Sequence, residues 1–299
     1  MAQSSRVSLD GLASVDMRVL SWNIHCLRGG GSRVGAIADA IASHAPDVVA
    51  LQEVSVEKRF PDVLASALAE RGLAGCAIGW PLARARKRYT NAVATRWEVH
   101  SPNVGPAADD ESRHWRHLVF SALVTPPSGD DILVFSVHMP NGSGNGWAKI
   151  DAFEALASAV DERTTPDCVV AGDFNEPFRF DDASAVSFAY RHGEQPDKLW
   201  PRRGRHTAVR EYPRRKWQDA VGRVLDGDTT LGVRRLPQKD GCYQRASHVT
   251  NGGHERLFDH VLVSRGLQSP GVTYDVSVLG TPGHDRLSDH AIVVADLSG

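Results

Sequence analysis

Short apolar runs alternate with amphipathic segments in the first third of the chain. Apolar and polar side chains alternate over residues 17–24, and this segment has enough β-branched residues for a strand. Residues 47–52 form a continuous apolar run, which suits a strand buried on both faces. Residues 33–44 and 60–71 each place apolar side chains along one helical stripe. The pattern therefore predicts that strand and helix alternate over this region.

The rest of the chain is richer in strands. The strands predicted there cover residues 90–96, 116–125, 132–138, 169–171, 258–264, 272–278 and 291–297. Turn-rich stretches separate the first three, as in an antiparallel sheet, and a long helix is predicted over residues 147–163. Two sheets packed face to face, with helices outside them, fit this mixture of elements.

Length and composition favour one large domain. The chain has 299 residues, of which 41% are hydrophobic, and no Pro/Gly/Ser-rich linker interrupts it. We expect a flexible tail over residues 1–16, which lack the pattern of a secretion signal, and a single domain over residues 17–299. No apolar run approaches the roughly 18 residues that a membrane span needs, so we expect a soluble protein without membrane insertion.

Cysteine spacing and charge distribution bear on the setting and the partners. The four cysteines are far apart and form no Cys-x-x-Cys pair, which argues against a zinc ribbon or redox motif and favours a reduced, cytoplasmic setting. The net charge of -2 says little about binding partners, because the local distribution of charged side chains matters more than their sum. Basic side chains gather in four places, which are either solvated loops or contacts to a phosphate backbone. They are Arg84, Arg86, Lys87 and Arg88; Arg202, Arg203 and Arg205; Arg214, Arg215 and Lys216; and Arg234, Arg235 and Lys239.

The candidate chemistry lies where predicted strands end in polar residues. An apolar run over residues 168–171 leads into Gly172-Asp173-Phe174-Asn175, and taken alone this tetrapeptide would fit ordinary turn capping. Five other strand-like runs end in polar residues of complementary chemistry, at Asn23, Glu53, His138, Asp259-His260 and Asp289-His290. Carboxylates, amides and imidazoles collected in this way are the groups with which hydrolases handle water.

In chain order, these residues resemble the signature of the endonuclease/exonuclease/phosphatase superfamily. The resemblance rests on Asn23, Leu51-Gln52-Glu53, His138, Gly172-Asp173-Phe174-Asn175, Phe258-Asp259-His260 and Ser288-Asp289-His290, and it extends from about Val19 to Leu297. That superfamily includes exonuclease III-type abasic-site endonucleases, DNase I, neutral sphingomyelinases and inositol polyphosphate phosphatases. The resemblance implies a DNase I-like fold, which is a four-layer α/β sandwich of two packed, mostly antiparallel sheets flanked by helices.

A metal site is the first requirement of the implied chemistry. Phosphodiester hydrolysis needs a cation, an activated water and a proton for the leaving oxygen. Glu53 closes an apolar strand, where an unpaired carboxylate is costly unless a cation neutralises it. Mg²⁺ prefers oxygen ligands, so Glu53, Asp289 and the amide oxygen of Asn23 form a sufficient protein shell. We therefore predict Mg²⁺ as the cofactor, with Mn²⁺ as the other candidate, and the resemblance makes Glu53 the main ligand.

The resemblance also implies catalytic roles. Asp173 would activate the water, and Asn175, on the same side of an extended backbone, would orient water or phosphate. Asp259 would fix the tautomer of His290 and favour its protonated form, so that His290 binds a phosphate oxygen. His260 is expected to be a bystander.

His138 and the segment after it point to different branches of the superfamily. DNase I-like and sphingomyelinase-like members hold a His here that is proposed to protonate the leaving oxygen, whereas exonuclease III-like members usually hold Tyr. The segment with Asn141 and Trp147 instead resembles the abasic-site enzymes, so these two residues and Asn91 are the predicted substrate contacts. His25 stands where many abasic-site endonucleases have Asp, which weakens the case for a second metal position.

Three classes of function follow from these motifs. The leading hypothesis is a Mg²⁺-dependent phosphodiesterase that acts on DNA, at abasic sites or from an end, as a monomer without an obligatory protein partner. The alternative is a phosphoesterase on a small or lipid headgroup substrate, similar to a sphingomyelinase or an inositol phosphate phosphatase, and His138 leaves it open. A binding module on an inactive scaffold is disfavoured, because such relatives normally lose some of the carboxylates and histidines that are all present here.

Overall fold

The alternation of side chains along the first strand sets the layers of the protein. In a computed structural model, β1 (Met17–Asn23) directs Val19 into a core shared with the second sheet, and directs Leu20 and Trp22 towards two helices. β2 (Val48–Ser55) alternates in the same way. Because successive side chains of a strand point to opposite faces, a strand that is buried on both faces needs a continuous apolar run.

The structure describes most of the chain, with gaps. The described residues are 16–25, 33–57, 59–79, 89–100, 118–127, 129–140, 146–165, 167–181, 185–188, 214–225, 231–242, 246–249, 253, 255–279 and 287–299. The predicted tail, residues 1–16, therefore lies outside them except for Asp16, and both the tail and the single domain stay predictions. No helix in the described ranges combines the length and the hydrophobicity that a membrane crossing needs.

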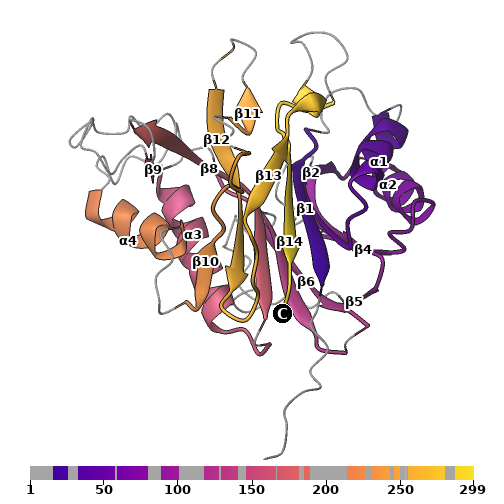
Figure 1. Ribbon diagram of the computed structural model, residues 1–299, viewed down its shortest axis with the longest axis horizontal. Helices are drawn as coiled ribbons and strands as arrows, with labels where there is room; N and C mark the ends of the chain where they lie inside the picture. Colours follow the sequence, from indigo (N-terminus) through magenta and orange to yellow (C-terminus); the bar gives the residue numbers. More distant parts are fainter. Residues whose placement is uncertain are drawn as a thin grey trace, which may run out of the picture.

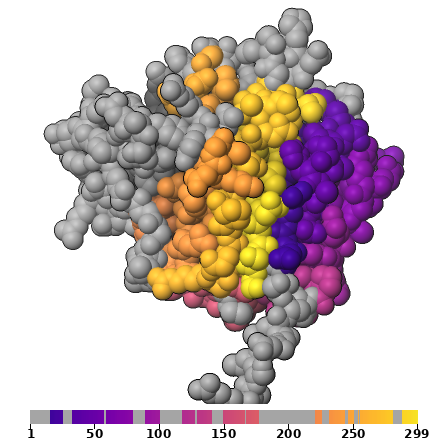
Figure 2. All heavy atoms as spheres, in the orientation of Figure 1, coloured from indigo at the N-terminus to yellow at the C-terminus, as the bar shows by residue number. Residues whose placement is uncertain are grey.

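Six strands form the first sheet, in the order β13-β14-β1-β2-β4-β3. The four strands not yet introduced are β3 (Gly75–Ile78), β4 (Tyr89–Thr95), β13 (Val272–Asp275) and β14 (Ile292–Leu297). β1 and β2 run parallel, and the other neighbours run antiparallel. β1 and β14 come from opposite ends of the chain, yet they lie side by side on the face shown in Figure 2.

Six strands also follow one another in the second sheet, in the order β10-β12-β8-β7-β6-β5, and two short strands pair at its side. Their bounds are β5 (Glu98–His100), β6 (Val119–Thr125), β7 (Ile132–His138), β8 (Cys168–Asp181), β9 (Ala185–Phe188), β10 (Val233–Arg235), β11 (His248–Val249) and β12 (Glu255–Ser264). Only β7 and β8 run parallel among the described pairs of this sheet. Both sheets are therefore mostly antiparallel.

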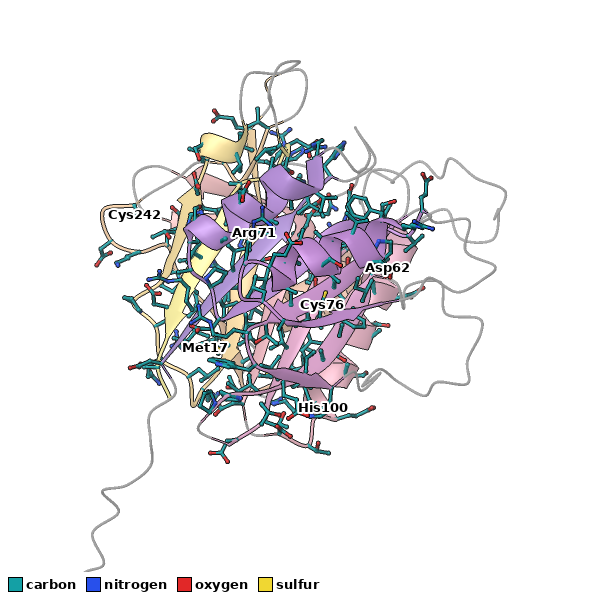
Figure 3. The ribbon with its side chains drawn as sticks, turned by 90° about the vertical axis from the view of Figure 1, so that its right-hand side faces the viewer. Met17, Asp62, Arg71, Cys76, His100 and Cys242 are labelled. Atoms are coloured by element: carbon teal, nitrogen blue, oxygen red, sulfur yellow. The ribbon has the colours of Figure 1, made fainter. Side chains whose placement is uncertain are left out.

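Helices cover the outer faces of the two sheets (Figure 1). α1 (Val34–Ser43) and α2 (Phe60–Ala69) pack together over the six-stranded sheet, as the turned view in Figure 3 shows. α3 (Gly146–Asp161) and α4 (Arg214–Leu225) pack together on the opposite side. The order helices, sheet, sheet, helices confirms the predicted four-layer α/β sandwich. The helical stripe predicted for α1 is buried and consists of Val34, Ile37, Ala38 and Ile41.

One strand is longer than the apolar pattern predicts. The sequence predicts a strand over residues 169–171 followed by a loop, but β8 continues to Asp181, and pairing with β12 and β9 carries it past the polar residues. Asp173 and Asn175 therefore lie within a strand rather than at its end. Gly172 is required at this point, because a Cβ atom there would overlap the carbonyl oxygen of Val137 on β7.

Candidate active site

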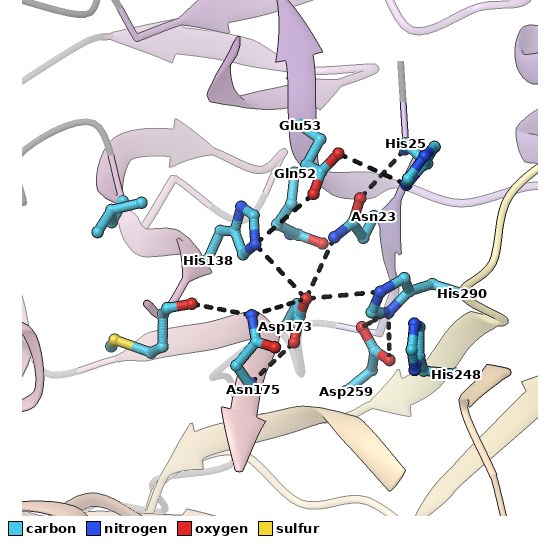
Figure 4. A network of polar contacts seen from close by, with 12 residues as sticks. Asn23, His25, Gln52, Glu53, His138, Asp173, Asn175, His248, Asp259 and His290 are labelled. Atoms are coloured by element: carbon cyan, nitrogen blue, oxygen red, sulfur yellow. Dashed lines mark hydrogen bonds and ion pairs between the residues drawn. The ribbon is translucent and has the colours of Figure 1, made fainter. Parts of the chain in front are cut away.

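Polar residues from both sheets meet at one place (Figure 4). The six-stranded sheet contributes Asn23 at the end of β1 and Glu53 in β2. The second sheet contributes His138 from β7, Asp173 from β8 and Asp259 from β12. The pairing of β7 and β12 with β8 sets His138 and Asp259 on either side of Asp173. Sheet register, rather than any single loop, therefore assembles the site.

Asp173 lies at the centre of this group and is only 1% exposed. Its Oδ2 atom accepts hydrogen bonds from the Nδ2 atoms of Asn23, at 3.2 Å, and Asn175, at 3.3 Å. The Nε2 atoms of His138 and His290 each lie 3.6 Å from the same oxygen. Burial raises the pKa of Asp173 to about 7, although the charge of His290 opposes the shift. A carboxyl group with this pKa can exchange a proton near neutral pH.

Asn175 is held beside Asp173 by its backbone and by a buried ion pair. Its φ of +50° lies in the left-handed region, which asparagine adopts more readily than most residues. The backbone N–H donates to Oδ1 of Asp173 at 2.8 Å, and Nδ2 donates to the carbonyl oxygen of Met139 at 2.9 Å. Behind it, the buried Nζ of Lys149 donates to the carbonyl oxygen of Asn175 at 2.6 Å and to Oε2 of Glu176 at 2.7 Å. These contacts fix the orientation of the Asn175 side chain.

Asp259 and His290 form a buried carboxylate–imidazole pair. The Nδ1 atom of His290 lies 2.9 Å from Oδ2 and 3.2 Å from Oδ1 of Asp259. Ser247 supports the carboxylate, because its Oγ donates to Oδ2 at 2.6 Å. Burial alone would lower the pKa of His290, but the charges of Asp259 and Asp173 raise it to about 10. These charges therefore favour the cationic form of His290, whose Nε2 faces Asp173.

The carboxylates of Glu53 and Asp289 both approach His25. The Nδ1 atom of His25 lies 3.0 Å from Oδ1 of Asp289 and 3.7 Å from Oε2 of Glu53. Glu53 occurs where the register between β2 and β4 shifts, and its φ is +56°. Burial raises the pKa of Glu53, and His25 and His290 oppose this shift. Burial would also raise the pKa of Asp289, but the nearby imidazoles of His25 and His290 hold it well below its usual range.

Asn23, Glu53 and Asp289 fit the predicted metal. Two carboxylates and an amide oxygen are the donors that Mg²⁺ binds, and the raised pKa of Glu53 shows that its charge is costly to bury without a cation. Among the described residues, the groups of three or more His, Cys, Asp and Glu side chains with ligand atoms within 4.8 Å of one another are instead His248, Asp289 and His290, and Asp173, Asp259 and His290. Both include His290, which is cationic and bonded to Asp259, so it is a poor ligand. The oxygen-rich group around Glu53 therefore stays the predicted metal site.

His138 faces the carboxylates of both sheets. Its Nε2 atom lies 3.8 Å from Oε1 of Glu53 and 3.6 Å from Oδ2 of Asp173. The ring of Tyr89 packs near its imidazole, with 5.5 Å between the ring centroids. His138 is only 7% exposed, so it lies inside the site rather than at its rim.

The three predicted substrate contacts stay predictions. Asn91 is fully buried, and its Nδ2 donates to the carbonyl oxygens of Leu118 and Ser136 at 2.9 Å each, which ties β4 to the second sheet. Asn141 lies outside the described residues. Trp147 lies in α3, but its side chain is not among those that the structure describes.

Sequence reasoning gives no role to three further residues of the site, His25, Ser247 and His248. The rings of His248 and His290 have centroids 4.5 Å apart, and Nε2 of His248 lies 3.9 Å from Oδ2 of Asp289. Ser247 and His248 sit at β11, a two-residue strand without any periodicity to reveal it. The one signal for His25 is that it replaces an aspartate of the resembled enzymes.

His260, the expected bystander, points away from this group of residues. It is 2% exposed and packs against Phe174, with 5.8 Å between the ring centroids. Burial, together with the charge of Arg235, holds its pKa well below the usual range of histidine. A neutral, buried imidazole in the core agrees with the expected lack of a catalytic role.

Comparison with known proteins relates the chain to solved structures of one fold. It is similar to the 3' phosphatase NExo from Neisseria bound to a product DNA hairpin, with 22% identity, coverage of 93% of this chain and 98% of that chain, and a TM-score of 0.56. It is also similar to an AP endonuclease from Archaeoglobus fulgidus, with 17% identity, coverage of 93% and 98%, and a TM-score of 0.58. A third similar structure is ANGEL2, a 2',3'-cyclic phosphatase, with 17% identity, coverage of 95% of each chain and a TM-score of 0.59.

The family itself is shown by the sequence. No curated protein matches the chain. The model of the Endonuclease/Exonuclease/phosphatase family, however, matches residues 20–290, a span that begins in β1 and includes the residues of the site from Asn23 to His290. The chain therefore belongs to the endonuclease/exonuclease/phosphatase family, whose members are hydrolases that act on phosphoester bonds.

Proposed function

We propose that this enzyme is a Mg²⁺-dependent phosphodiesterase that hydrolyses DNA by in-line attack of water, as an abasic-site endonuclease or an exonuclease III-like enzyme. The observation that carries the proposal is the set of contacts to Asp173, where one buried carboxylate oxygen faces two amides and two imidazoles. The carboxylates of Glu53 and Asp289 both approach the imidazole of His25, at 3.7 Å and 3.0 Å respectively. A base, a cation site and proton donors are the three requirements of the reaction.

Asp173 is the proposed base for the attacking water. Its pKa of about 7 suits proton transfer near neutral pH, and its fixed hydrogen bonds orient the carboxylate. Asn175 would orient the water or the phosphate, because its side chain is held at Asp173. Bound at Asn23, Glu53 and Asp289, Mg²⁺ would neutralise charge on the phosphoryl oxygens and lower the pKa of water.

The two imidazoles at Asp173 have different proposed roles. His290 is cationic because Asp259 and Asp173 raise its pKa, so it suits a non-bridging phosphate oxygen on which charge develops. His138 faces Asp173 from the other side of the site and would give a proton to the leaving oxygen. In this proposal, His290 contacts the charged phosphate oxygen of the substrate, and His138 contacts the leaving oxygen.

DNA is the substrate class to test first. Two of the structures that share this fold are described as a 3' phosphatase bound to a DNA hairpin and as an AP endonuclease. Of the four basic clusters, the one with described side chains is at β10, where Arg234 donates to the carbonyl oxygen of Leu267. Contacts from the other clusters would make binding fall steeply as salt rises. A monomeric state, a cytoplasmic location and the absence of an obligatory protein partner stay predictions.

The test of this function uses three DNA substrates. Purified protein with Mg²⁺ is incubated with intact duplex, duplex that carries one abasic site, and single strand. We expect cleavage of at least one, which EDTA and Asp173→Asn each abolish. Asp39→Asn is the matched control, because Asp39 is an exposed aspartate that pairs with Arg71 on the helical face. No cleavage of any DNA by the wild-type protein would rule the proposal out.

A phosphoesterase on a small or lipid headgroup substrate is the second candidate. It is favoured by His138, since the resembled sphingomyelinase-like enzymes hold a histidine at this place, and Nε2 of His138 does approach both Glu53 and Asp173. Release of phosphate from inositol phosphates, or of phosphocholine from sphingomyelin, without cleavage of DNA would replace the first candidate by this one.

A further inference from the structure

One buried ion pair of the molecule has no role in the proposed reaction. Nζ of Lys149, in α3, lies 2.7 Å from Oε2 of Glu176, in β8, and the two side chains are 1% and 0% exposed. Among the residues that the structure describes, Lys149 is the one lysine or arginine that is buried. Phe153 of the same helix packs against Phe174 of β8, with 6.2 Å between the ring centroids. The helix therefore holds the pair against the strand that carries Asp173.

The two charges of this pair are costly to bury. Burial lowers the pKa of Lys149, although the charge of Glu176 opposes the shift. Because desolvation offsets much of the attraction between two buried charges, apolar side chains of similar volume often stabilise a fold equally well or better. The contribution of the pair to stability therefore does not by itself explain why two charges stand here.

The ammonium group of Lys149 is bonded to the backbone of Asn175 as well. Its Nζ donates to the carbonyl oxygen of Asn175 at 2.6 Å, so one cation joins this carbonyl group to the carboxylate of Glu176. The φ of Asn175 is +50°, and a left-handed residue other than glycine persists only where its surroundings determine it. From this conformation, the side-chain amide of Asn175 donates to Asp173 (Figure 4). The cation therefore holds the backbone from which the amide reaches the proposed base.

We propose that Lys149 and Glu176 are positioning residues, which hold the amide of Asn175 where it orients the attacking water or the phosphate. The proposal rests on the proposed hydrolytic function and adds the support of one of its groups. Glu176 keeps the ammonium group in place, and Lys149 fixes the carbonyl group of Asn175. Both side chains are enclosed by protein, so they act through Asn175. Because a misplacement of about 1 Å can lower a rate by about 100-fold, the fixing of one amide can outweigh the unfavourable burial of two charges.

Replacement of the pair by apolar side chains separates positioning from a structural role. Lys149→Met with Glu176→Leu removes both charges together, so no unpaired charge stays buried, and we expect a urea midpoint equal to or above that of the wild type. On the DNA that the wild type cleaves, we expect kcat to fall about 10- to 100-fold and KM to stay within about threefold, because the amide acts on the transition state. Arg71→Met with Asp39→Leu is the matched control, since it removes an ion pair of the same 2.7 Å distance on the helical face, and it should keep the kcat of the wild type.

Two further measurements show whether the pair acts through Asn175. In an Asn175→Gly background, which suits the left-handed backbone, the apolar replacement should cause no further loss of kcat, because residues that act as a unit are not additive. Without DNA, the side-chain amide signals of Asn175 in an NMR spectrum, assigned by their absence from Asn175→Gly, should shift in the apolar replacement and not in the control. This second readout needs neither a substrate nor a metal.

A folded apolar replacement with the kcat and the Asn175 signals of the wild type would overturn the proposal. A loss of kcat that adds fully to that of Asn175→Gly would overturn it too, because the pair would then act elsewhere. If the apolar replacement does not fold, Lys149→Met with Glu176→Gln repeats the test, since it removes the donor to Asn175 and retains the shape of Glu176. Failure of both variants to fold would also overturn the proposal, because the pair would then serve the fold itself. A wild type that cleaves no DNA would contradict the proposed function alone, and the amide signals would still decide the role of the pair.

Discussion

The two halves of the site differ in how far they are buried. We call Glu53, Asp289 and His25 the open half, and Asp173, Asp259 and His290 the buried half. Side-chain exposure is 15%, 20% and 24% in the open half, and 2%, 1% and 6% in the buried half. The open half is therefore more accessible to an ion and its waters, whereas the side chains of the buried half, which form the sealed side of the site, are almost fully enclosed by protein.

The difference in exposure suggests that ion binding and proton transfer take place on different sides of the site. In the buried half, burial raises the pKa of Asp173 to about 7 against the charge of His290, and the charges of Asp259 and Asp173 raise the pKa of His290 to about 10. In the open half, the carboxylates of Glu53 and Asp289 share His25, and a cation can still reach them. The difference in exposure therefore supports the proposed division, in which the sealed side transfers protons and the accessible side binds the ion.

Asp173→Asn should have the largest effect. Removal of a general base costs about 10²- to 10⁴-fold in turnover, because proton transfer contributes that much. Steady-state hydrolysis of DNA by the variant and the wild type measures this loss, with Asp39→Asn as the control. Turnover within a few-fold of wild type would show that the sealed side does not carry the base.

The same variant should also remove a pH dependence of stability. Burial raises the pKa of Asp173 from 3.8 to about 7, so the folded protein holds this proton more tightly than the unfolded chain does. Stability from this difference is complete below about pH 4 and is lost as the pH rises through 7. In EDTA, the contribution of Asp173 should therefore make the stability of the wild type fall more, or rise less, between these pH values than that of Asp173→Asn. Equal slopes in urea denaturation at several pH values would contradict the raised pKa.

Lys149→Met should destabilise the fold rather than change the chemistry directly. The variant leaves the carboxylate of Glu176 buried without its ion-pair partner, and breaking a buried pair in this way costs about 3–5 kcal/mol. Lys239→Met, at an exposed lysine, should change stability by about 0.5 kcal/mol or less. Urea denaturation measures both. Equal stability of the two variants would mean that the Lys149–Glu176 ion pair beneath Asn175 is not buried as the structure has it.

Asp259→Asn should lower turnover more than substrate affinity. A hydrogen bond to a charged group contributes about 1.5–3 kcal/mol, which corresponds to about tenfold or more in rate. The pKa of His290 should fall from about 10, because Asp259 is the largest of the influences that raise it. Kinetics give kcat and KM, and NMR titration gives the pKa. An unchanged kcat would remove Asp259 from the mechanism.

The sequence predicts those parts of the fold and site that local pattern encodes. Both faces of β1 and β2 are apolar, so the buried strands that carry Asn23 and Glu53 follow from hydrophobicity alone. The motif residues were identifiable because each follows an apolar run. Their convergence, however, depends on the register between β7, β8 and β12, which no single segment specifies.

The parts that sequence reasoning missed are those that non-local pairing creates. β8 extends past Asp173 because β12 and β9 pair with it, although Asp and Asn favour turns. Ser247 and His248 reach the site because the two-residue β11 pairs with β12 and His248 bridges to His290. Such placements depend on tertiary context that overrides local propensity.

Glu53→Gln should have the smallest effect on the stability of the metal-free protein, and it tests the open half by itself. Burial raises the pKa of Glu53, so the stability linked to its proton is present at low pH and is lost as the pH rises through the folded-state pKa. In EDTA at neutral pH, the variant should therefore be at least as stable as the wild type. Mg²⁺ at 100 times its Kd should stabilise the wild type by about 2.7 kcal/mol, and the variant by less. Thermal unfolding in EDTA and in Mg²⁺ measures both effects. If Mg²⁺ stabilised the variant and the wild type equally, the ion would not bind at Glu53, and ion binding would not be a property of the open half.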